Sequence, residues 1–230
     1  MKRISVPLVF LAAVTAMNLG STQATPLQNG NFDTGDFTGW SGALSYSDNS
    51  YNTVDVNVSP DGDSHFSISN VPNQTFTNSA TISNDNYYWI AMLFQDFTLE
   101  PLQGPGYTMD ITFWAKWDPT DSTYDEVSAQ LQDTGYTDPV DLLDGISTAD
   151  LLNGTWVTRD ITDFARTWGG QDVELLFSVT DWDWSTPDSL VLDNISLNQH
   201  APAPVPEPAT IFLLGSGLGG IALARRKKES

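Results

Sequence analysis

The sequence contains no cysteine, only two histidines, and only nine lysine and arginine residues against 29 acidic ones. The lack of cysteine excludes disulfide bonds, so the fold must be stabilised by an apolar core or by a bound metal ion. The histidines are His65 and His200, and a zinc site or a Ser-His-Asp triad would depend on His65 alone, because His200 begins a Pro/Ala-rich stretch. Nor is there a basic patch to bind phosphates, which argues against a nucleic-acid partner.

The negative charge lies between the two ends of the chain. Residues 25–200 hold 27 acidic residues and three basic ones, a net charge of about −24 at neutral pH. Such a surface repels anionic lipid and attracts cations, among which Ca²⁺ prefers oxygen ligands. A solvated acidic surface that keeps the protein soluble explains most of this charge without any site.

The N-terminus has the three parts of a signal peptide. Met1–Arg3 is basic, Val6–Ala16 is apolar, and Thr22–Ala24 offers small residues for cleavage. The apolar part is too short to span a membrane. We therefore predict a signal peptide over residues 1–24, with an uncleaved anchor as the alternative.

The C-terminus combines a proline motif, an apolar run and a basic end. Residues 209–224 are uncharged and would form a helix of about 24 Å, a short span for roughly 30 Å of bilayer hydrocarbon. The basic residues after it would stay on the cytoplasmic side. The tail therefore predicts either a plain membrane anchor or a sorting signal that is cut near its proline motif. The motif and the basic end consist of Pro206, Glu207, Pro208, Arg225, Arg226, Lys227 and Lys228.

This order of motif, apolar run and basic end resembles the PEP-CTERM signal of bacterial exported proteins, over residues 206–230. The resemblance implies processing by an exosortase-type membrane transpeptidase, in a host that makes extracellular polysaccharide. It also implies delivery to the cell surface or extracellular matrix, with the C-terminal helix anchored in the membrane transiently or permanently. Residues 198–205, rich in proline and alanine, are expected to form a stiff spacer before the signal.

The middle of the chain has the pattern of an all-β domain. Short runs with alternating apolar residues are separated by turns rich in Gly, Asn and Asp, and Tyr107–Trp117 is the clearest example. Trp89–Phe94 is apolar throughout, as expected of a central strand buried on both faces. Asp160–Trp168 is the best candidate for a helical turn or two. We predict one β-sandwich or jelly roll over residues 25–197.

Four segments of this domain are similar to galactose-binding-like jelly rolls and to carbohydrate-binding modules of that type. The resemblance implies a single jelly-roll β-sandwich and makes extracellular polysaccharide the expected partner. It does not settle the function, because such jelly rolls also serve as passive spacers. The segments are Leu27–Asp33 with Gly39 and Trp40, Gln95–Leu99 with Tyr107–Lys116, Gly154–Val157, and Leu192–Leu197.

Several aromatic residues could stack on a sugar ring. Trp114 is predicted to point away from the core, beside Lys116, although a loop could cover it. Trp182 and Trp184 fall in a polar loop with neighbouring carboxylates, although one of them could instead plug the end of the sandwich. The remaining candidates are expected in the core: Trp40, Tyr87, Tyr88, Trp89 and Trp156.

The resemblance to galactose-binding-like modules also implies a structural calcium ion between the first and last strands. The matching positions are Asp33 and Asp193, and the alternative is two ordinary turn acids.

Three functions fit the sequence. The first, which we expect, is a non-catalytic exported protein that binds extracellular polysaccharide. The second is a structural matrix protein without a ligand pocket, acting through charge, Ca²⁺ and tethering. The third is a glycosidase, which stays open because acids abound, even though adjacent acids such as Asp125 and Glu126 point to opposite faces of a strand.

Overall fold

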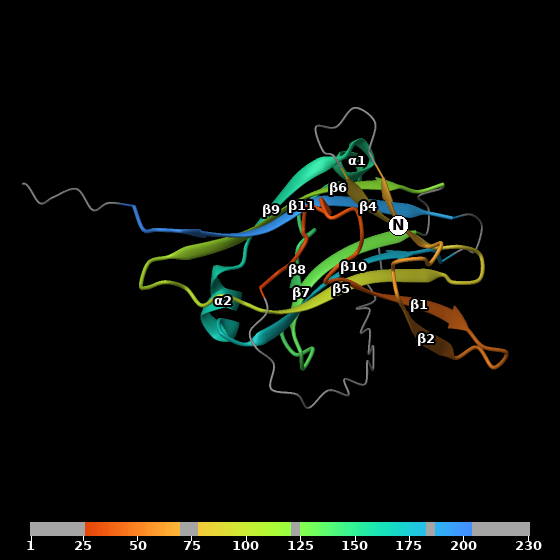
Figure 1. Ribbon diagram of the computed structural model, residues 1–230, viewed down its shortest axis with the longest axis horizontal. Coiled ribbons are helices and arrows are strands. Elements are labelled where there is room, and N and C mark those ends of the chain that lie inside the picture. The colour runs from red at the N-terminus through yellow and green to blue at the C-terminus, as the bar shows by residue number, and fades with distance from the viewer. Residues whose placement is uncertain (1–25, 70–77, 121–124, 183–186, 204–230) are drawn as a thin grey trace, which may run out of the picture. The chain divides into compact units, whose positions relative to one another are not determined.

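Two antiparallel β-sheets face each other in the computed structural model, which describes residues 26–69, 78–120, 125–182 and 187–203 (Figure 1). Sheet A contains, in spatial order, β2 (Thr53–Val58), β1 (Ser41–Ser47), β5 (Ile90–Thr98), β10 (Asp172–Thr180), β7 (Glu126–Asp133) and β8 (Val140–Asp141). Sheet B contains β3 (Phe66–Ser69), β4 (Ser79–Ser83), β11 (Ser189–His200), β6 (Thr108–Asp118) and β9 (Thr155–Asp160). Two short helices, α1 (Thr148–Asn153) and α2 (Thr162–Trp168), flank β9 in sequence.

The strand order is that of a jelly roll. Counted from β4, sheet B holds the first, eighth, third and sixth strands as β4-β11-β6-β9. Sheet A holds the second, seventh, fourth and fifth as β5-β10-β7-β8. This alternation between sheets defines the eight-stranded jelly roll. The β1–β2 hairpin and β3 each extend one sheet at its edge. The all-β jelly-roll prediction is confirmed.

The core lies between the sheets and follows the alternation seen in the sequence. On β6, the odd-numbered residues from Met109 to Trp117 are all buried, as predicted. The odd-numbered residues of β10, from Val173 to Val179, meet them from sheet A. Phe113 and Phe177 make an edge-to-face contact, with ring centroids 5.3 Å apart.

Strand β5 is buried on both faces, as its continuous apolar sequence predicts. Ala91, Leu93 and Phe97 belong to the main core. Ile90, Met92 and Phe94 point to the other face of sheet A and form a second buried cluster with Ala43 and Trp89. Because β5 lies between β1 and β10, it has the central place expected of such a strand.

The domain boundary differs from the prediction by three residues. Strand β11 continues to His200, because Asn198, Gln199 and His200 pair with β6, so the domain does not end at residue 197. None of the helices in the described ranges has the length and apolar character needed to cross a membrane. The predicted signal peptide, Trp184 and the predicted helix over 209–224 lie outside the described residues.

Candidate functional site

One end of the sandwich, called here the loop end, gathers three loops. The antiparallel register places Thr180, the last residue of β10, between Ile90 at the start of β5 and Glu126 at the start of β7. In sheet B, Ser189 at the start of β11 lies between the last residues of β4 and β6. The β4–β5, β6–β7 and β10–β11 loops therefore meet at this end.

Aromatic rings cluster at the loop end. Tyr87 stacks on Tyr46 with centroids 5.1 Å apart and an interplanar angle of 18°, and Tyr88 lies edge-on to both. Trp182 packs on the buried Trp89 at 5.0 Å. Tyr87 is 56% exposed and Trp182 is 40% exposed, so each presents ring surface to solvent while a neighbouring ring holds it.

Trp182 lies where the sequence placed it, whereas Tyr87 was expected in the core and is exposed. The polar run Asn84-Asp85-Asn86 directly before Tyr87 is the signal that would have indicated a surface loop.

His65 fixes the loop that carries Tyr87. Its Nδ1 lies 2.8 Å from Asp63 Oδ1 and its Nε2 lies 3.1 Å from Asp85 Oδ2. Asp85 also accepts hydrogen bonds from the backbone N–H groups of Tyr87 and Tyr88. Burial raises the pKa of the Asp85 carboxyl, but these N–H groups and His65 together outweigh burial, so that the pKa is lowered. Each ring nitrogen of His65 lies beside a carboxylate, one on the β2–β3 loop and one on the β4–β5 loop. His65 therefore connects these two loops.

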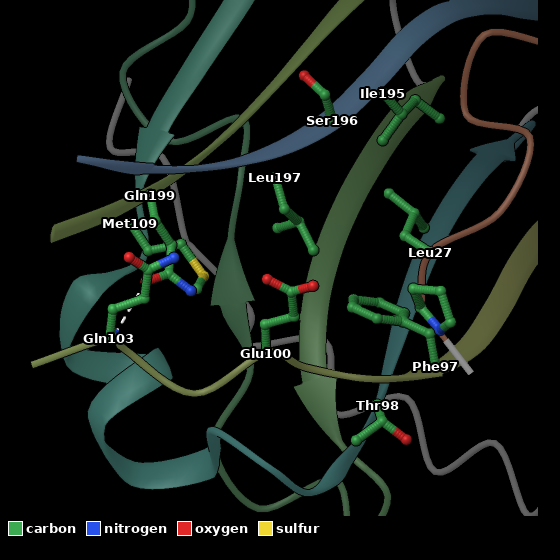
Figure 2. Close-up of a pocket in the computed structure, with 11 residues that line it drawn as sticks. Leu27, Phe97, Thr98, Glu100, Gln103, Met109, Ile195, Ser196, Leu197 and Gln199 are labelled. Atoms are coloured by element: carbon green, nitrogen blue, oxygen red, sulfur yellow. Dashed lines mark hydrogen bonds between the residues drawn. The ribbon is translucent and has the colours of Figure 1, made fainter. Parts of the chain in front are cut away.

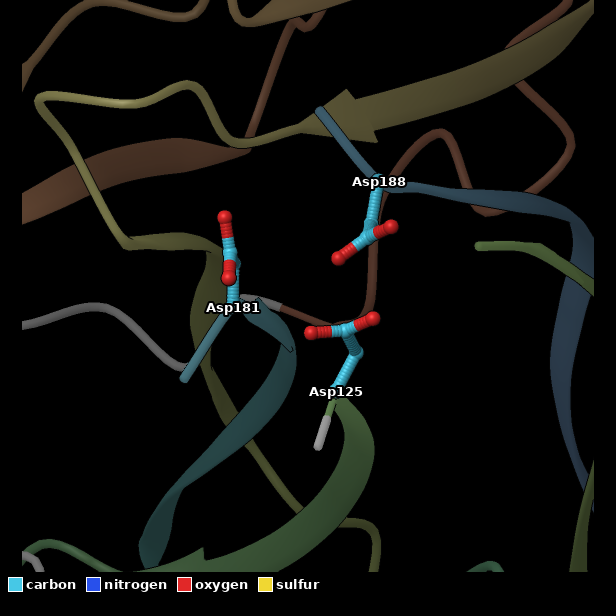
Figure 3. Close-up of side chains that lie close together, drawn as sticks. All are labelled: Asp125, Asp181 and Asp188. Atoms are coloured by element: carbon cyan, nitrogen blue, oxygen red, sulfur yellow. The ribbon is translucent and has the colours of Figure 1, made fainter. Parts of the chain in front are cut away.

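Three aspartates converge beside these loops, as Figure 3 shows. Asp125 directly precedes β7, Asp181 directly follows β10 and Asp188 directly precedes β11, so the strand register brings them together. One carboxylate oxygen from each lies within 4.8 Å of the others, and Asp181 and Asp188 are buried. Such an oxygen set could hold a hard cation. The sequence did not reveal this group, because it depends on pairing between distant strands.

Asp193, one of the two predicted calcium ligands, lies at the bulge of β11. The turn that carries Asp33 docks there through a hydrogen bond from Ile195 N–H to the Gly30 carbonyl, at 2.8 Å. Asp193 is buried and accepts hydrogen bonds from Asn194 N–H and the Ser79 hydroxyl. Burial raises the pKa of Asp193 to about 6, and the negative charge of Asp33 adds to this effect. Asp33 and Asp193 are therefore close enough to interact electrostatically.

Trp114 is not available for stacking. It points away from the main core, as predicted, but it is only 3% exposed, because the chain at Gly154 covers it. A β-carbon at position 154 would lie 2.5 Å from Trp114 Cζ2. The prediction that Trp114 stacks on a sugar is wrong, and Lys116 beside it pairs with Asp118 at 3.6 Å. Trp156, opposite Trp114 on β9, is 55% exposed rather than in the core.

The end opposite the loop end holds a crevice of about 490 Å³ between the sheets (Figure 2). Its apolar lining comes from Pro26, Leu27, Phe97, Met109, Ile195 and Leu197. Its polar lining comes from Thr98, Glu100, Gln103, Ser196 and Gln199. The sequence did not predict this crevice.

Comparison with known proteins identifies the tail. Residues 204–228 match the PEP-CTERM protein-sorting motif, so the chain carries such a motif, as predicted. None of the curated proteins compared is a match.

Several solved structures resemble the domain at low identity. A carbohydrate-binding module specific for non-crystalline cellulose, CBM28, is 14% identical, with 77% of this chain and 95% of that chain covered and a TM-score of 0.38. The enzymatically active domain of bacteriophage CBA120 tailspike protein 4 is 15% identical, with 77% and 22% covered and a TM-score of 0.45. The CBM22-1–GH10 modules of Clostridium thermocellum xylanase 10B, complexed with xylohexaose, are 12% identical, with 78% and 29% covered and a TM-score of 0.35. The chain spans less than a third of the tailspike and xylanase chains.

Proposed function

We propose that this protein is exported, sorted by an exosortase-type transpeptidase through its C-terminal motif, and binds extracellular polysaccharide without catalysing a reaction. The sorting motif supports export to the cell surface or matrix. The polysaccharide-binding proposal rests on two exposed rings at the loop end, Tyr87 and Trp182, each of which packs on another aromatic ring.

The geometry of these rings suits a sugar. The C–H face of a pyranose packs on an aromatic ring while polar neighbours bind its hydroxyls. Because Tyr46 and Trp89 hold the two rings in place, little side-chain freedom is lost on binding. The net charge of about −24 over residues 25–200 disfavours anionic polymers, so a neutral polysaccharide is the expected partner.

A glycosidase is the second candidate function, and one pair of acids favours it. Glu174 on β10 lies directly opposite Asp96 on β5, so both point to the outer face of sheet A. Burial raises the pKa of Glu174; the hydrogen bond from Gln132 opposes that shift and Asp96 adds to it. A carboxyl group with a raised pKa can act as a general acid. Release of reducing sugar by the wild type, and its loss in Glu174→Gln, would favour this function over ours.

Structural calcium at Asp33 and Asp193 is part of the proposal. The negative charge of Asp33 disfavours ionisation of the buried Asp193, and a divalent cation bound between the two carboxylates would offset that repulsion. The ion would fix the Asn29–Asp33 turn against β11.

Affinity gel electrophoresis tests the proposed function. Full-length wild type and Tyr87→Ala, Trp182→Ala and double variants are run through gels containing neutral cellulose, xylan or galactan derivatives. At least one polymer should retard the wild type, and the double variant should migrate as in a polymer-free gel.

Trp156→Ala is the matched control, because it removes a tryptophan of sheet B that is more exposed than Trp182, and this variant should still be retarded. A wild type that no polymer retards, or a double variant retarded like the wild type, would contradict the proposed site.

A further inference from the structure

The crevice at the end opposite the loop end has the construction of a small-ligand site. Phe97 is the second-last residue of β5, Met109 is the second residue of β6 and Ile195 lies on β11, and all three are buried, so they form a rigid apolar floor. The volume of about 490 Å³ falls in the range of roughly 300–1,000 Å³ that is usual for small-ligand pockets. Leu27 and Leu197 are partly exposed beside this floor, where a ligand could replace water.

The rim of the crevice is polar, and part of it is already fixed. The Gln199 side chain donates to the Pro101 carbonyl at 3.0 Å and accepts from the Gln103 N–H at 3.1 Å, which ties the β5–β6 loop to β11. Within the described ranges, the side chains of Glu100 and Gln103 make no hydrogen bond or ion pair. Figure 2 shows the Glu100 carboxylate directed toward Leu197.

The charge of the lining excludes anionic ligands. Among its eleven residues there is no lysine, arginine or histidine, and Glu100 contributes the one carboxylate. An anion would be desolvated beside a negative charge with no cation to offset it. The crevice therefore suits a neutral ligand with an apolar surface and several hydroxyls.

We infer that this crevice binds a short neutral saccharide, such as one end of a polysaccharide chain. A pyranose has both required surfaces: C–H groups to lie on the partly exposed Leu27 and Leu197, and hydroxyls to donate to Glu100 and exchange hydrogen bonds with Gln103. This inference rests on the proposed function, because it takes the ligand to be a saccharide. It adds a second site, for a chain end, to the exposed rings at the loop end.

Two methionines allow each site to be observed separately. Met109 lies in the floor of the crevice. Met92 belongs to the cluster that contains Trp89, on which Trp182 packs. In full-length chain labelled with ¹³C-methyl methionine, each neutral disaccharide (cellobiose, xylobiose and lactose) and the anionic digalacturonate are titrated in turn. At least one neutral disaccharide should shift the Met109 methyl signal, and digalacturonate should not.

The variants make this test specific. Glu100→Gln combined with Gln103→Ala changes only the exposed rim. It should raise the dissociation constant measured from the Met109 signal about tenfold, as expected when a hydrogen bond to a charged group is lost. Leu197→Trp fills the crevice and should abolish the shift. Glu126→Gln, which removes an equal charge at the loop end, should leave it unchanged.

A Met109 signal that no neutral disaccharide shifts overturns the inference, and so does a rim variant that titrates like the wild type. If the Met109 signal does not shift, a shift at Met92 or retardation in the polymer gels would show that the proposed function stands while the crevice site does not.

Discussion

The two ends of this sandwich differ in which parts of the fold supply the side chains of each candidate site. At the loop end, Tyr87 and Trp182 stand on connections between strands and present flat ring surface outward. At the crevice end, Phe97, Met109 and Ile195 belong to the strands themselves and line a hollow. The same pair of sheets thus offers a surface suited to a long polymer and a recess suited to a chain end.

Gly30→Ala should have the largest effect and should damage the crevice end selectively. A β-carbon at this position would lie 2.1 Å from the Ile195 carbonyl oxygen, which is backbone and cannot move aside easily. The turn that positions Leu27 would lose its hydrogen bond to β11, and we expect a loss of about 3 kcal/mol in the free energy of unfolding. Urea denaturation measures it.

Gly104→Ala is the control, because its nearest neighbours lie 3.8 Å or more from the added carbon. In Gly30→Ala the Met109 methyl signal should move and that of Met92 should not. Equal disturbance of both signals would contradict the independence of the two ends.

Asp85→Ala should loosen the loop end at an intermediate cost. It removes the acceptor of His65 and of two backbone N–H groups, which we expect to cost about 2 kcal/mol. Retardation by polymer should fall with it, because Tyr87 loses its support. Asp160→Ala removes another carboxylate that accepts a backbone hydrogen bond, from Thr162 N–H at the start of α2, and should leave retardation unchanged.

The stability that Asp85 contributes to the folded state should decrease as the solution is acidified. Because its pKa is lowered in the folded state, it contributes stability above its unfolded pKa, near 4, and that stability is lost as the pH falls through the folded value. Denaturation curves from pH 6 to pH 3 should therefore converge for wild type and Asp85→Ala. A difference that widens on acidification would contradict the assignment.

Asp193→Asn should have the smallest effect and should separate the predicted calcium pair from the three aspartates at the loop end. The raised pKa of about 6 means that Asp193 binds its proton more tightly in the folded state than in the unfolded state. When a chelator removes calcium, Asp193 therefore lowers the free energy of unfolding as the pH rises from about 4 to about 6, and it lowers it no further above that range. The melting temperature of the wild type should fall across this range relative to Asp193→Asn.

Calcium should raise the melting temperature of the wild type by several degrees at pH 7 and leave Asp193→Asn unchanged, because binding to the folded state alone adds stability. If Asp188→Asn and not Asp193→Asn abolishes the shift, the ion lies at the loop end. If calcium shifts neither protein, the calcium proposal is wrong.

The sequence predicted what depends on local pattern. Alternation placed Phe113 toward the core and Trp114 away from it, and both placements are correct. Alternation indicates only which face of a strand a residue is on, so it could not show that the chain at Gly154 covers Trp114.

Features that depend on contacts between distant segments were not predictable in the same way. Asp125, Asp181 and Asp188 meet only because Glu126 pairs with Thr180 and β11 begins beside them, and no local pattern encodes that register. The crevice likewise needs the ends of β5, β6 and β11 in place. Asp33 and Asp193, by contrast, were paired from their resemblance to galactose-binding-like modules, and the negative charge of Asp33 contributes to the raised pKa of Asp193; the calcium ion between them stays a prediction.

The position of β11 determines how the domain bears mechanical load. This strand leads into the sorting tail, and within sheet B it is hydrogen-bonded to β4 on one side and β6 on the other. The two ladders do not cover the same residues: β4 pairs only with Ser189–Leu192, whereas Ser196–His200 pair with β6 alone. A force applied at His200 would therefore act first on the ladder to β6 and would reach the ladder to β4 only after the C-terminal half of β11. The strand is thus held on both sides only at the end that is farther from the tail.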